Sequence, residues 1–290
     1  MERNKVYKNV SLTKFNSWKV GGKAENFVIC SDINFLCQLI KSKKVQKPIK
    51  FIGLGSNILV RDNGVKGTTI VMHKGLNNFF KEDELFYSEA GLSCSKFSKL
   101  IAKEGHIGSA FLSGIPGTIG GALAMNAGCY GSEIWSFVKK VKMINADGDL
   151  IERDPNDFKV GYRKIQKKDE AENFVGAWFS FLKGKKLDAE ENIRKLLSHR
   201  KNTQPLSWPS AGSTFKNPDN NHAAKLIEDC GLKGFKIGDA KISEKHANFI
   251  INLGAARAKD IEDLIKHIKK IVLIKTKIKL IPEVEIIGDV

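Results

Sequence analysis

The segment from Ser113 to Gly131 has the composition of a backbone that binds a large ligand. Six of its nineteen residues are glycine, and nearly all the others are small, uncharged or apolar. Because glycine carries an entropic cost, this concentration indicates that the backbone closely approaches something large and flat. Its N–H groups could bind a diphosphate while its apolar residues cover a ring system. A flexible lid is the alternative, but lids are usually polar, so the composition favours a buried cofactor.

A second glycine motif covers residues 53–57 (Gly-Leu-Gly-Ser-Asn) and follows a predicted strand. A G-x-G motif after a strand is typical of the dinucleotide fingerprint, but Ile58 stands where that fingerprint requires its third glycine. The residues that follow also favour a strand over a helix, so a Rossmann site is not supported. The backbone N–H groups could still bind a phosphate, and a plain turn is an equally good interpretation.

The polar candidates for catalysis are ambiguous when each is taken alone. Ser213 lies in a Gly-Ser-Thr run, where a hydroxyl usually closes a turn, and the G-x-S-x-G nucleophile motif is absent. Glu283 alternates with apolar neighbours, which places it on the solvent side of a predicted strand. Tyr162 and Arg163 have the character of an ordinary surface pair.

The composition is that of a folded protein able to position such residues. The chain has 290 residues, of which 42% are hydrophobic and 28% charged, so a core is expected and wholesale disorder is not. The longest uncharged stretch, from Gly105 to Ser132, holds eight glycines and predicts a loop, because a membrane span needs roughly 20 mostly apolar residues. The N-terminus has no apolar signal-peptide core. Five scattered cysteines favour reduced cytosolic thiols and no metal site.

Hydrophobic periodicity predicts mixed helices and strands without strict βαβ alternation, in two or more lobes. Strands are predicted over residues 24–29, 49–54, 58–61, 68–72, 85–90, 174–183 and 278–287, with a hairpin over 138–153. Helices are predicted over residues 33–41, 93–104, 189–199 and 223–230, with a long amphipathic helix around 261–272. Residues 201–218 are predicted to form an ordered loop. Ser31 or Asp32 is expected to cap the first helix, and Gly105 and Gly231 to end two others.

The net charge of +16 predicts attraction to polyanions of some kind. Nucleic-acid binding would need the lysines on one face with aromatic residues among them. The lysine clusters contain no aromatic residue, and those of the last helix flank its apolar stripe as a solvated face does. A small phosphorylated ligand is therefore favoured over nucleic acid, and a surplus without function is the remaining alternative.

Eight motifs spread along nearly the whole chain resemble, in order, those of the UDP-N-acetylenolpyruvoylglucosamine reductases, the MurB family. They are VGGKAE at 20–25, GLGSNILVR at 53–61, SGIPGTIGGA at 113–122, GYR at 161–163, SAGSTFKNP at 210–218, LIEDCGLKG at 226–234, SEKHANF at 243–249 and IPEVEIIG at 281–288.

The resemblance implies an α+β fold and an order of domains. The expected architecture is an FAD-binding module of the vanillyl-alcohol-oxidase (PCMH) type, built of two subdomains, followed by a C-terminal α+β substrate domain. We expect an N-terminal segment over 1–18, the FAD-binding module over 19–184 with its subdomains split near residue 75, and the substrate-binding domain over 185–290.

The resemblance also implies an activity, in which NADPH reduces the double bond of an enolpyruvyl ether through FAD. Hydride reaches C3 of the enolpyruvyl group, negative charge develops at C2 and in the carboxylate, and C2 is then protonated. Arg163 is matched to the residue that pairs with the substrate carboxylate, which a guanidinium does two-on-two. Ser213 is matched to the proton donor, and Glu283 to an acid whose pKa desolvation would raise.

The remaining site residues follow from the same resemblance. Residues matched to cofactor binding are Gly53, Gly55, Ser56, Asn57, Ile58, Ser113, Gly114, Ile115, Pro116, Gly117, Gly120, Gly121, Asn126 and Gly128. Residues matched to the substrate are Tyr162, Gln204, Lys216 and Asn217. Cys129 lies within the glycine-rich segment and is interpreted as packing.

The chain resembles the shorter type of the family, without the loop that closes a tyrosine over the substrate diphosphate. We expect a cytoplasmic monomer with UDP-N-acetylglucosamine enolpyruvate and NADPH as its partners, and with no nucleic acid and no membrane. Two other functions stay open at this point: a flavin oxidase of the same fold, and a polyanion-binding protein that is not an enzyme.

Overall fold

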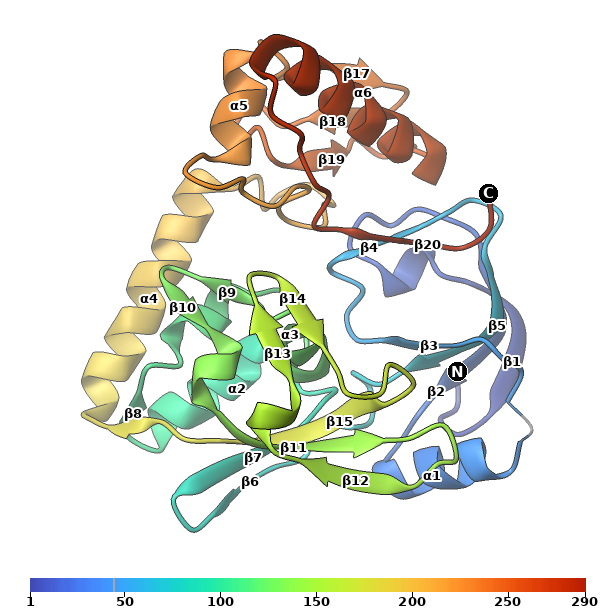
Figure 1. The fold of residues 1–290 in the computed structure, drawn as a ribbon, viewed down its shortest axis with the longest axis vertical. Coiled ribbons are helices and arrows are strands. Elements are labelled where there is room, and N and C mark those ends of the chain that lie inside the picture. The colour runs from blue at the N-terminus through green and yellow to red at the C-terminus, as the bar shows by residue number, and fades with distance from the viewer. Residues whose placement is uncertain (44) are drawn as a thin grey trace. The chain divides into compact units, whose positions relative to one another are not determined.

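The computed structural model describes residues 1–43 and 45–290. The chain divides into two compact units, each built from separate stretches of sequence. Unit 1 comprises Met1–Tyr7, Asn26–Leu54 and Gly67–Arg200, and unit 2 comprises Lys8–Glu25, Gly55–Lys66 and Lys201–Val290. The boundary falls within strands β1 (Val6–Ser11), β2 (Lys23–Ile29) and β5 (Val65–Val71) and within helix α4 (Lys186–Thr203). Figure 1 labels the elements of both units.

The largest sheet of unit 1 is antiparallel and has five strands (Figure 1). In spatial order they are β12 (Leu150–Arg153), β11 (Val138–Ile144), β15 (Asn173–Phe179), β7 (Leu85–Glu89) and β6 (Phe79–Glu82). The helix α2 (Cys94–Lys103) contributes to the same core, where the rings of Phe97 and Phe179 lie 4.9 Å apart. Aromatic pairs at this separation add to the stability that burial alone supplies.

A second part of unit 1 pairs the parallel strands β3 (Ile49–Ile52) and β5. These strands belong to a four-stranded sheet of order β1-β2-β5-β3. The helix α1 (Ile33–Lys41) begins after Asp32, whose carboxylate accepts a hydrogen bond of 2.8 Å from the Phe35 N–H and so caps the helix. Leu36, Leu39 and Ile40 of this helix are buried, as the sequence periodicity predicts.

Shorter elements complete unit 1. The strands are β8 (His106–Ile107), β9 (Gly128–Cys129), β10 (Ser132–Glu133), β13 (Lys159–Gly161), β14 (Lys164–Gln166) and β16 (Leu182–Lys183). The helix α3 is Ile119–Ala124, and 3-10 turns lie at η2 (Ala110–Gly114), η3 (Ile134–Phe137) and η4 (Pro155–Asp157). Two of the short pairings are hairpins, β9 with β10 and β13 with β14.

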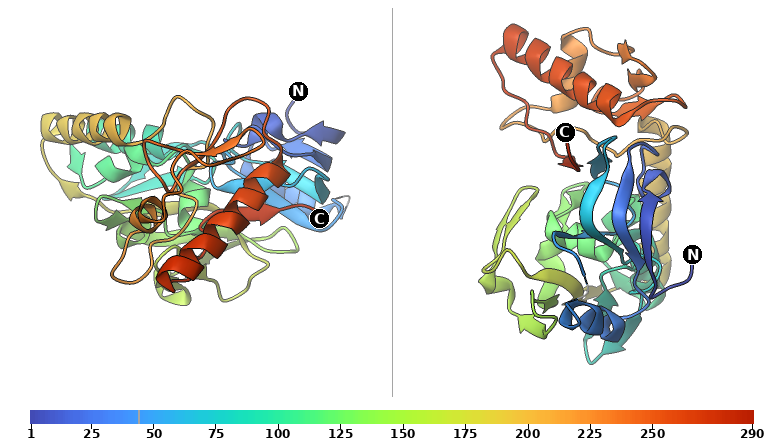
Figure 2. Two further views of the ribbon diagram at one scale, coloured as in Figure 1. Left: turned by 90° about the horizontal axis from the view of Figure 1, so that it is seen from above. Right: turned by 90° about the vertical axis from the view of Figure 1, so that its right-hand side faces the viewer.

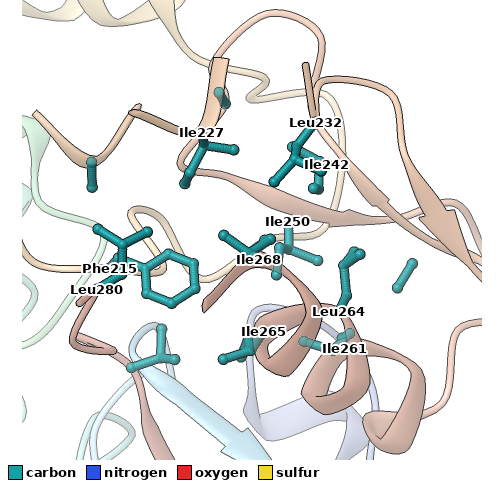
Figure 3. Packing of buried hydrophobic residues seen from close by; sticks show 14 of the residues in the cluster. Phe215, Ile227, Leu232, Ile242, Ile250, Ile261, Leu264, Ile265, Ile268 and Leu280 are labelled. Atoms are coloured by element: carbon teal, nitrogen blue, oxygen red, sulfur yellow. The ribbon is translucent and has the colours of Figure 1, made fainter. Parts of the chain in front are cut away.

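Unit 2 is organised by the long helix α6 (Ala258–Thr276), which Figure 2 shows as one uninterrupted helix. Ile261, Leu264, Ile265 and Ile268 recur at helical spacing and are buried. Figure 3 shows these side chains directed into a core that Phe215 and other apolar residues complete. The apolar stripe predicted from the sequence is therefore the side of the helix that builds this core.

The other elements of unit 2 are short. They are η1 (Thr13–Phe15), β4 (Ile58–Val60), α5 (Ala223–Asp229), β17 (Lys236–Ile237), β18 (Ala240–Ile242), β19 (Ile250–Asn252) and β20 (Glu285–Ile287). The strands β17, β18 and β19 form an antiparallel sheet, and β20 pairs with β4 in parallel. This last pairing joins residues that are 227 positions apart, since Ile58 faces Glu285.

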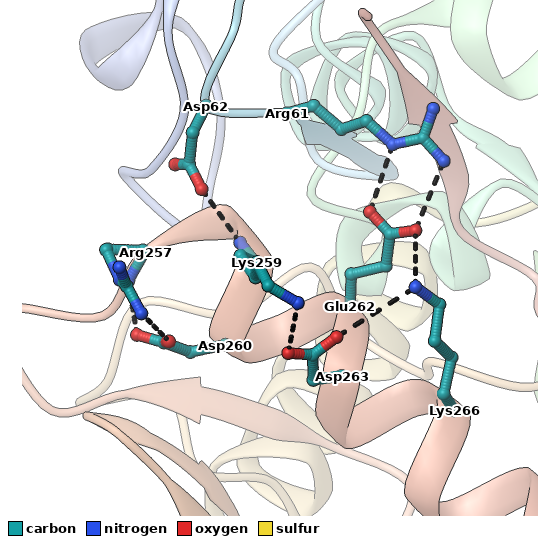
Figure 4. A network of polar contacts seen from close by, with 8 residues as sticks. All are labelled: Arg61, Asp62, Arg257, Lys259, Asp260, Glu262, Asp263 and Lys266. Atoms are coloured by element: carbon teal, nitrogen blue, oxygen red, sulfur yellow. Dashed lines mark hydrogen bonds and ion pairs between the residues drawn. The ribbon is translucent and has the colours of Figure 1, made fainter. Parts of the chain in front are cut away.

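An ionic network fixes α6 to the segment that follows β4 (Figure 4). The Arg61 guanidinium donates to both carboxylate oxygens of Glu262, at 3.0 and 3.1 Å, and Lys266 lies 3.2 Å from the same carboxylate. Asp62 accepts from the N–H groups of Ala258 and Lys259 at 3.0 Å each, which satisfies two donors at the start of the helix.

We expect Glu262→Gln to destabilise the protein by about 1–2 kcal/mol at pH 7, because the Glu262 side chain is only 15% exposed and charged hydrogen bonds contribute more than neutral ones. The hydrogen bond from Arg61 holds the pKa of Glu262 below its usual value. Glu262 therefore stabilises the fold above its unfolded pKa of about 4.3, and this contribution is lost as the pH falls through the lower folded pKa. Thermal unfolding at pH 7 and pH 3.5 measures both effects.

The matched control is Asp263→Asn, one position along the helix, where the side chain is more exposed and pairs with Lys259 and Lys266. Exposed pairs contribute little, so this variant should unfold within a degree or two of the wild type. If both variants lose the same free energy of unfolding at both pH values, the hydrogen bonds from Arg61 to Glu262 contribute no more to stability than an exposed ion pair does.

Most elements predicted from the sequence are confirmed, with bounds that shift by one or two residues, or by three or four residues for β5 and α6. These are β2, α1, β3, β4, β5, β7, α2, the β11–β12 hairpin, α5 and α6. Gly231 follows α5 with φ +73, as expected of a residue that ends a helix. The predicted division into residues 1–18, 19–184 and 185–290 stays a prediction, and the two compact units follow different boundaries.

The prediction of a strand over residues 278–287 was wrong in extent, because only β20 at its end is a strand. Pro282 forms no more than an isolated bridge with Phe215, and proline lacks the N–H that a ladder requires. The strand predicted over 174–183 is divided into β15 and β16.

One helical region was missed and another was predicted too short. The glycine-rich stretch 105–132 was predicted as a loop, yet it contains η2 and α3, whose cap Thr118 accepts from the Gly121 N–H at 3.4 Å. The helix predicted over 189–199 extends over all of α4, so the predicted loop 201–218 begins inside it. Exposed ion pairs four residues apart, such as Lys195 with Glu191, support its surface. Among the described residues, no helix has the length and hydropathy needed to span a bilayer.

Candidate active site

The start of the first glycine motif, Gly53 and Leu54, meets the second motif within unit 1, whereas residues 55–57 of the first motif belong to unit 2. A Cβ atom built on Gly53 would collide with the side chain of Thr118, so the backbone of the first motif lies directly against the second. Gly120 is equally tight, because a Cβ there would lie 2.7 Å from the Cβ of Ala90. The ring of His73 fixes the first motif further, since its Nδ1 lies 2.8 Å from the Gly53 carbonyl oxygen. Burial lowers the pKa of His73, so this ring is neutral at pH 7.

Several backbone donors at this junction have no acceptor within the described part of the chain. They are the N–H groups of Gly53, Leu54, Gly117 and Thr118. Backbone N–H groups without partners in glycine-rich turns are the usual ligands of phosphate oxygens. The junction of the two motifs therefore fits the diphosphate of a dinucleotide such as FAD.

Gly121 provides an independent sign that a ligand approaches this helix. It is an exposed glycine inside α3, and a Cβ there would meet only the Thr118 Oγ1, at 3.6 Å. A glycine at such a position costs about 1 kcal/mol of helix stability relative to alanine. No contact within the described residues requires that cost, whereas close approach of a flat ligand would.

We expect Gly120→Ala and Gly121→Ala to behave differently. Gly120→Ala should destabilise the protein by about 1–3 kcal/mol through overpacking against Ala90. Gly121→Ala should leave the thermal stability of the flavin-free protein unchanged or slightly higher, and yet weaken FAD binding by tenfold or more. Thermal unfolding of the flavin-free protein and titration with FAD measure the two effects. Unchanged FAD affinity in Gly121→Ala would mean that the ligand does not contact this turn of the helix.

The rest of the glycine-rich segment is held by its own side chains. Ser113 Oγ donates to the Ala110 carbonyl at 2.6 Å. Asn126 is fully buried, and its Nδ2 donates to Glu133 at 2.6 Å and to the Gly161 carbonyl at 3.2 Å. These contacts fix the loop conformation, so the predicted cofactor residues Ser113 and Asn126 have structural partners. Gly114, Ile115, Pro116 and Gly117 lie between them on partly or fully exposed backbone.

Arg163 lies at the two-residue turn between β13 and β14, with φ +51. Its guanidinium donates to the carbonyl oxygens of Asn126, at 3.2 Å, and of Gly128, and it lies 3.5 Å from a carboxylate oxygen of Glu133. The Arg163 side chain is only 14% exposed, whereas Tyr162 beside it is 48% exposed and lies under the guanidinium at 4.9 Å. The residue predicted to bind the substrate carboxylate is therefore a cation that these contacts hold at the end of the glycine-rich segment.

Cys129 lies between these groups but is not a nucleophile. Burial raises the pKa of its thiol to about 11, although the guanidinium groups of Arg163 and Arg200 favour the thiolate. The thiol donates to the Phe111 carbonyl at 3.2 Å. Because reactivity requires the thiolate, the interpretation of Cys129 as a packing residue agrees with its surroundings.

In unit 2, the chain near Ser213 pairs with the chain near Glu283. Phe215 and Pro282 form an antiparallel bridge, with the Glu283 N–H donating to the Thr214 carbonyl at 2.8 Å and the Lys216 N–H to the Ile281 carbonyl at 2.9 Å. Two of the three predicted catalytic residues, Ser213 and Glu283, therefore lie on adjacent segments of chain, although they are 70 positions apart in the sequence.

Asn57 supports the same arrangement from a third stretch of chain. Its Nδ2 donates to the Glu283 carbonyl at 3.1 Å, and its own carbonyl accepts from the Glu285 N–H at 2.9 Å. Ile58 pairs with Glu285 in the parallel sheet. Gly55, with φ +65, packs against Phe15 and accepts from the Ser17 N–H at 3.0 Å. Ser56 lies between them and is half-buried.

The predicted substrate residues of unit 2 lie at two places. Gln204 lines a cavity of about 650 Å³ together with Trp208, Lys241 and Lys245. Asn217 is exposed, and its Oδ1 accepts from the Ala223 N–H at 3.0 Å at the start of α5. Lys216 is half-buried beside the bridge described above.

The structure brings the predicted site residues into two groups. Unit 1 holds Arg163 with Asn126 and Gly128, and unit 2 holds Ser213 with Glu283 and Asn57. His73 was not predicted from the sequence, because a lone histidine carries no signal. Thr118 was not predicted either, although threonine is a common residue at the position that caps the start of a helix.

Comparisons with known proteins decide which family this arrangement belongs to. The model of the C-terminal domain of UDP-N-acetylenolpyruvoylglucosamine reductase matches residues 204–287, and the FAD binding domain model matches residues 25–154. The UDP-N-acetylenolpyruvoylglucosamine reductase of Nitrosomonas eutropha is 44% identical over 99% of this chain and 90% of its own length. The chain belongs to the UDP-N-acetylenolpyruvoylglucosamine reductase family. It is therefore an FAD-dependent oxidoreductase, as the motifs predicted.

Other members of the UDP-N-acetylenolpyruvoylglucosamine reductase family agree with this assignment. The protein of that name from Methylococcus capsulatus is 44% identical over 96% of this chain and 91% of its own length. The crystal structure of the enzyme from Thermus caldophilus matches with a TM-score of 0.84 at 30% identity, over 98% of this chain and 99% of the other. The α+β class with an FAD-binding module and a family-specific C-terminal domain is thereby confirmed. Neither a flavin oxidase nor a polyanion-binding protein is supported.

Proposed function

We propose that this protein reduces UDP-N-acetylglucosamine enolpyruvate to UDP-N-acetylmuramate with NADPH, a step in the synthesis of peptidoglycan precursors. The observation that carries the proposal is the pairing of the chain near Ser213 with the chain near Glu283, in a member of this reductase family. The unpaired N–H groups at the junction of the glycine motifs support FAD as the cofactor. When bound, FAD carries the hydride from NADPH to the alkene of the substrate.

The chain itself has to bind the substrate carboxylate and supply a proton. We propose that Arg163 binds the carboxylate, because its planar group meets two oxygens at once and keeps its charge at every physiological pH. Ser213 donates the proton to C2 as negative charge develops there, and its hydroxyl recovers a proton from water. A hydroxyl is a weak acid, but a carbanion-like centre is a strong base, so correct geometry suffices for the transfer.

Glu283 has the third role. We propose that it stabilises the developing enolate by a hydrogen bond from its protonated carboxyl group, as a carboxylic acid in a desolvated site can. Support comes from the position of its backbone, which is fixed on both sides, by the Thr214 carbonyl and by Asn57. A backbone held in this way limits the positions that the Glu283 side chain can take relative to the segment that carries Ser213.

The nucleotide part of the substrate needs cations and an extended surface. We propose that the diphosphate binds at the cavity of Gln204, with Lys216 and Asn217 toward the sugar. The cations Lys201, Lys241 and Lys245 line this cavity and outnumber its carboxylate, Glu244, which pairs with Lys241. A cavity of about 650 Å³ falls within the range of roughly 300–1,000 Å³ that is usual for small-molecule sites. In this proposal the lysines neutralise the diphosphate without the tyrosine loop of the longer family type.

We further propose that the enzyme works as a monomer in the cytoplasm, without nucleic-acid or membrane partners. Its five cysteines are all free thiols, as is usual in a reducing compartment. NADPH, the proposed hydride donor, is also a cytosolic reductant.

The proposed function is tested by following the colour of the flavin. The purified protein should be yellow, and anaerobic NADPH should bleach it. Addition of UDP-N-acetylglucosamine enolpyruvate to the reduced protein should restore the yellow colour with formation of one equivalent of UDP-N-acetylmuramate. Plain UDP-N-acetylglucosamine, which lacks the alkene, is the matched control and should leave the protein bleached. Reduced protein that stays bleached with both compounds would overturn the proposal.

A further inference from the structure

Asn248 has a buried amide side chain that bonds to the segment of chain 213–216, the Ser213 segment. Its side chain is 3% exposed. Its Oδ1 accepts from the Phe215 N–H at 2.9 Å, and its Nδ2 donates to the Phe215 carbonyl at 2.8 Å. In addition, its backbone carbonyl accepts from the Thr214 N–H at 2.8 Å. Three hydrogen bonds from one residue therefore hold the two residues that follow Ser213.

These bonds complete the attachment of the Ser213 segment. Thr214 and Lys216 bond to the backbone around Glu283. Phe215 pairs with no second strand among the described residues, and the bonds to Asn248 take the place of such a partner. An Asn side chain can do this because its amide has the same donor and acceptor as a peptide group. Without it, a buried N–H and a buried carbonyl of Phe215 would lack partners, which is costly.

We propose that Asn248 is a positioning residue for proton transfer, because it holds the backbone that carries Ser213 beside the segment that carries Glu283. The inference rests on the proposed function, in which Ser213 donates the proton. Asn248 itself acts only through Phe215 and Thr214. Errors of about 1 Å in the placement of a reacting group can cost on the order of 100-fold in rate, so the loss of this clamp should slow proton transfer and little else.

The chain offers a matched control in Asn252, another asparagine that is 3% exposed. Its side chain also makes three hydrogen bonds to backbone, to Trp18, Gly254 and Ala256, at 2.9, 2.8 and 3.1 Å. None of those partners belongs to the Ser213 segment. Asn248→Leu and Asn252→Leu remove the same kind of side chain from the same unit, so they should lower the melting temperature by similar amounts.

The experiment uses FAD-loaded protein and measures each half-reaction by anaerobic stopped flow. We expect Asn248→Leu to slow reoxidation by UDP-N-acetylglucosamine enolpyruvate about 100-fold, with flavin reduction by NADPH within twofold of the wild type. Its solvent deuterium isotope effect on reoxidation should rise, because proton transfer becomes rate-limiting. Asn252→Leu should keep both half-reactions within about twofold of the wild type.

A double variant tests whether Asn248 acts through Ser213. If it does, Ser213→Ala combined with Asn248→Leu should be reoxidised at the rate of Ser213→Ala alone, since residues that act as a unit are not additive. Losses that multiply would overturn the proposal. So would reoxidation of Asn248→Leu at the rate of Asn252→Leu.

A readout without turnover comes from amide hydrogen exchange in the absence of substrate. The peptide that contains residues 213–217 should exchange faster in Asn248→Leu than in the wild type. Its exchange rate in Asn252→Leu should equal that of the wild type. If Asn248→Leu does not fold, Asn248→Asp replaces it, because the aspartate keeps the acceptor for the Phe215 N–H and loses the donor. It should show the same pattern with a smaller loss. If the sugar nucleotide fails to reoxidise the wild-type enzyme, the proposed function and this inference both fail. If the wild type is reoxidised normally and Asn248→Leu is reoxidised equally fast, only this inference fails.

Discussion

Replacement of Ser213 by alanine should slow reoxidation of the reduced enzyme by UDP-N-acetylglucosamine enolpyruvate about 1,000-fold, within the range that general acid catalysis supplies. Flavin reduction by NADPH should stay within twofold of the wild type, because that step needs no proton from this hydroxyl. Anaerobic stopped-flow absorbance near the flavin maximum separates the two half-reactions.

Ser210→Ala is the control for this variant, since Ser210 lies in the same motif and has no predicted role. It should be kinetically normal. If Ser213→Ala slowed both half-reactions together, Ser213 would have a structural role in the turn rather than a role in proton transfer.

Arg163→Lys should lower kcat/KM for the enolpyruvyl substrate by about 100-fold, because the ammonium keeps the charge but loses the two-on-two geometry of the guanidinium. The loss should fall on the half-reaction with the sugar nucleotide and leave reduction by NADPH nearly unchanged. Steady-state kinetics over substrate concentration, together with single-turnover bleaching, measure the two parts.

Arg163 also has contacts that stabilise the fold. The Arg163 guanidinium bonds to the carbonyl oxygens of Asn126 and Gly128, so its removal could disturb the glycine-rich segment instead. In that case Arg163→Lys would lose FAD and melt at a lower temperature. Arg194→Lys, at an exposed position on α4, controls for the exchange of the two cations and should behave as the wild type.

Local features of the sequence were sufficient to predict local structure. Asp32 before an apolar run predicted the start of α1, and turn residues between two alternating runs predicted the β11–β12 hairpin. Each of these depends on contacts between residues close in sequence, where capping and periodicity carry most of the information. The binding role of the glycine-rich segment was predicted from its composition and stays a prediction, and the helix α3 within it was missed.

Distant pairings could not be predicted in this way. Neither Phe215 nor Pro282 has a property that identifies the other as its partner, and the bridge between them depends on the whole core of unit 2. The contacts of Arg163 with the Gly128 carbonyl, and of His73 with the Gly53 carbonyl, are likewise side chain to backbone, where the acceptor is common to every residue type. Only the resemblance to a family indicated that Ser213 and Glu283 belong to one site. The isolated bridge between Phe215 and Pro282 brings their two segments of chain side by side, and the shared site stays a prediction.

The parallel pairing of β4 with β20 has a consequence for folding during synthesis on the ribosome. Residues 58–60 emerge early in translation, but their partners at 285–287 are made 227 residues later. Unit 2 therefore cannot close while the chain is still being elongated, whereas the β11–β12 hairpin of unit 1 can form as soon as it leaves the exit tunnel. Contacts of such long range are slow to form and leave hydrophobic surface uncovered meanwhile. The early part of unit 2 is thus the stretch that chaperones have the longest time to bind.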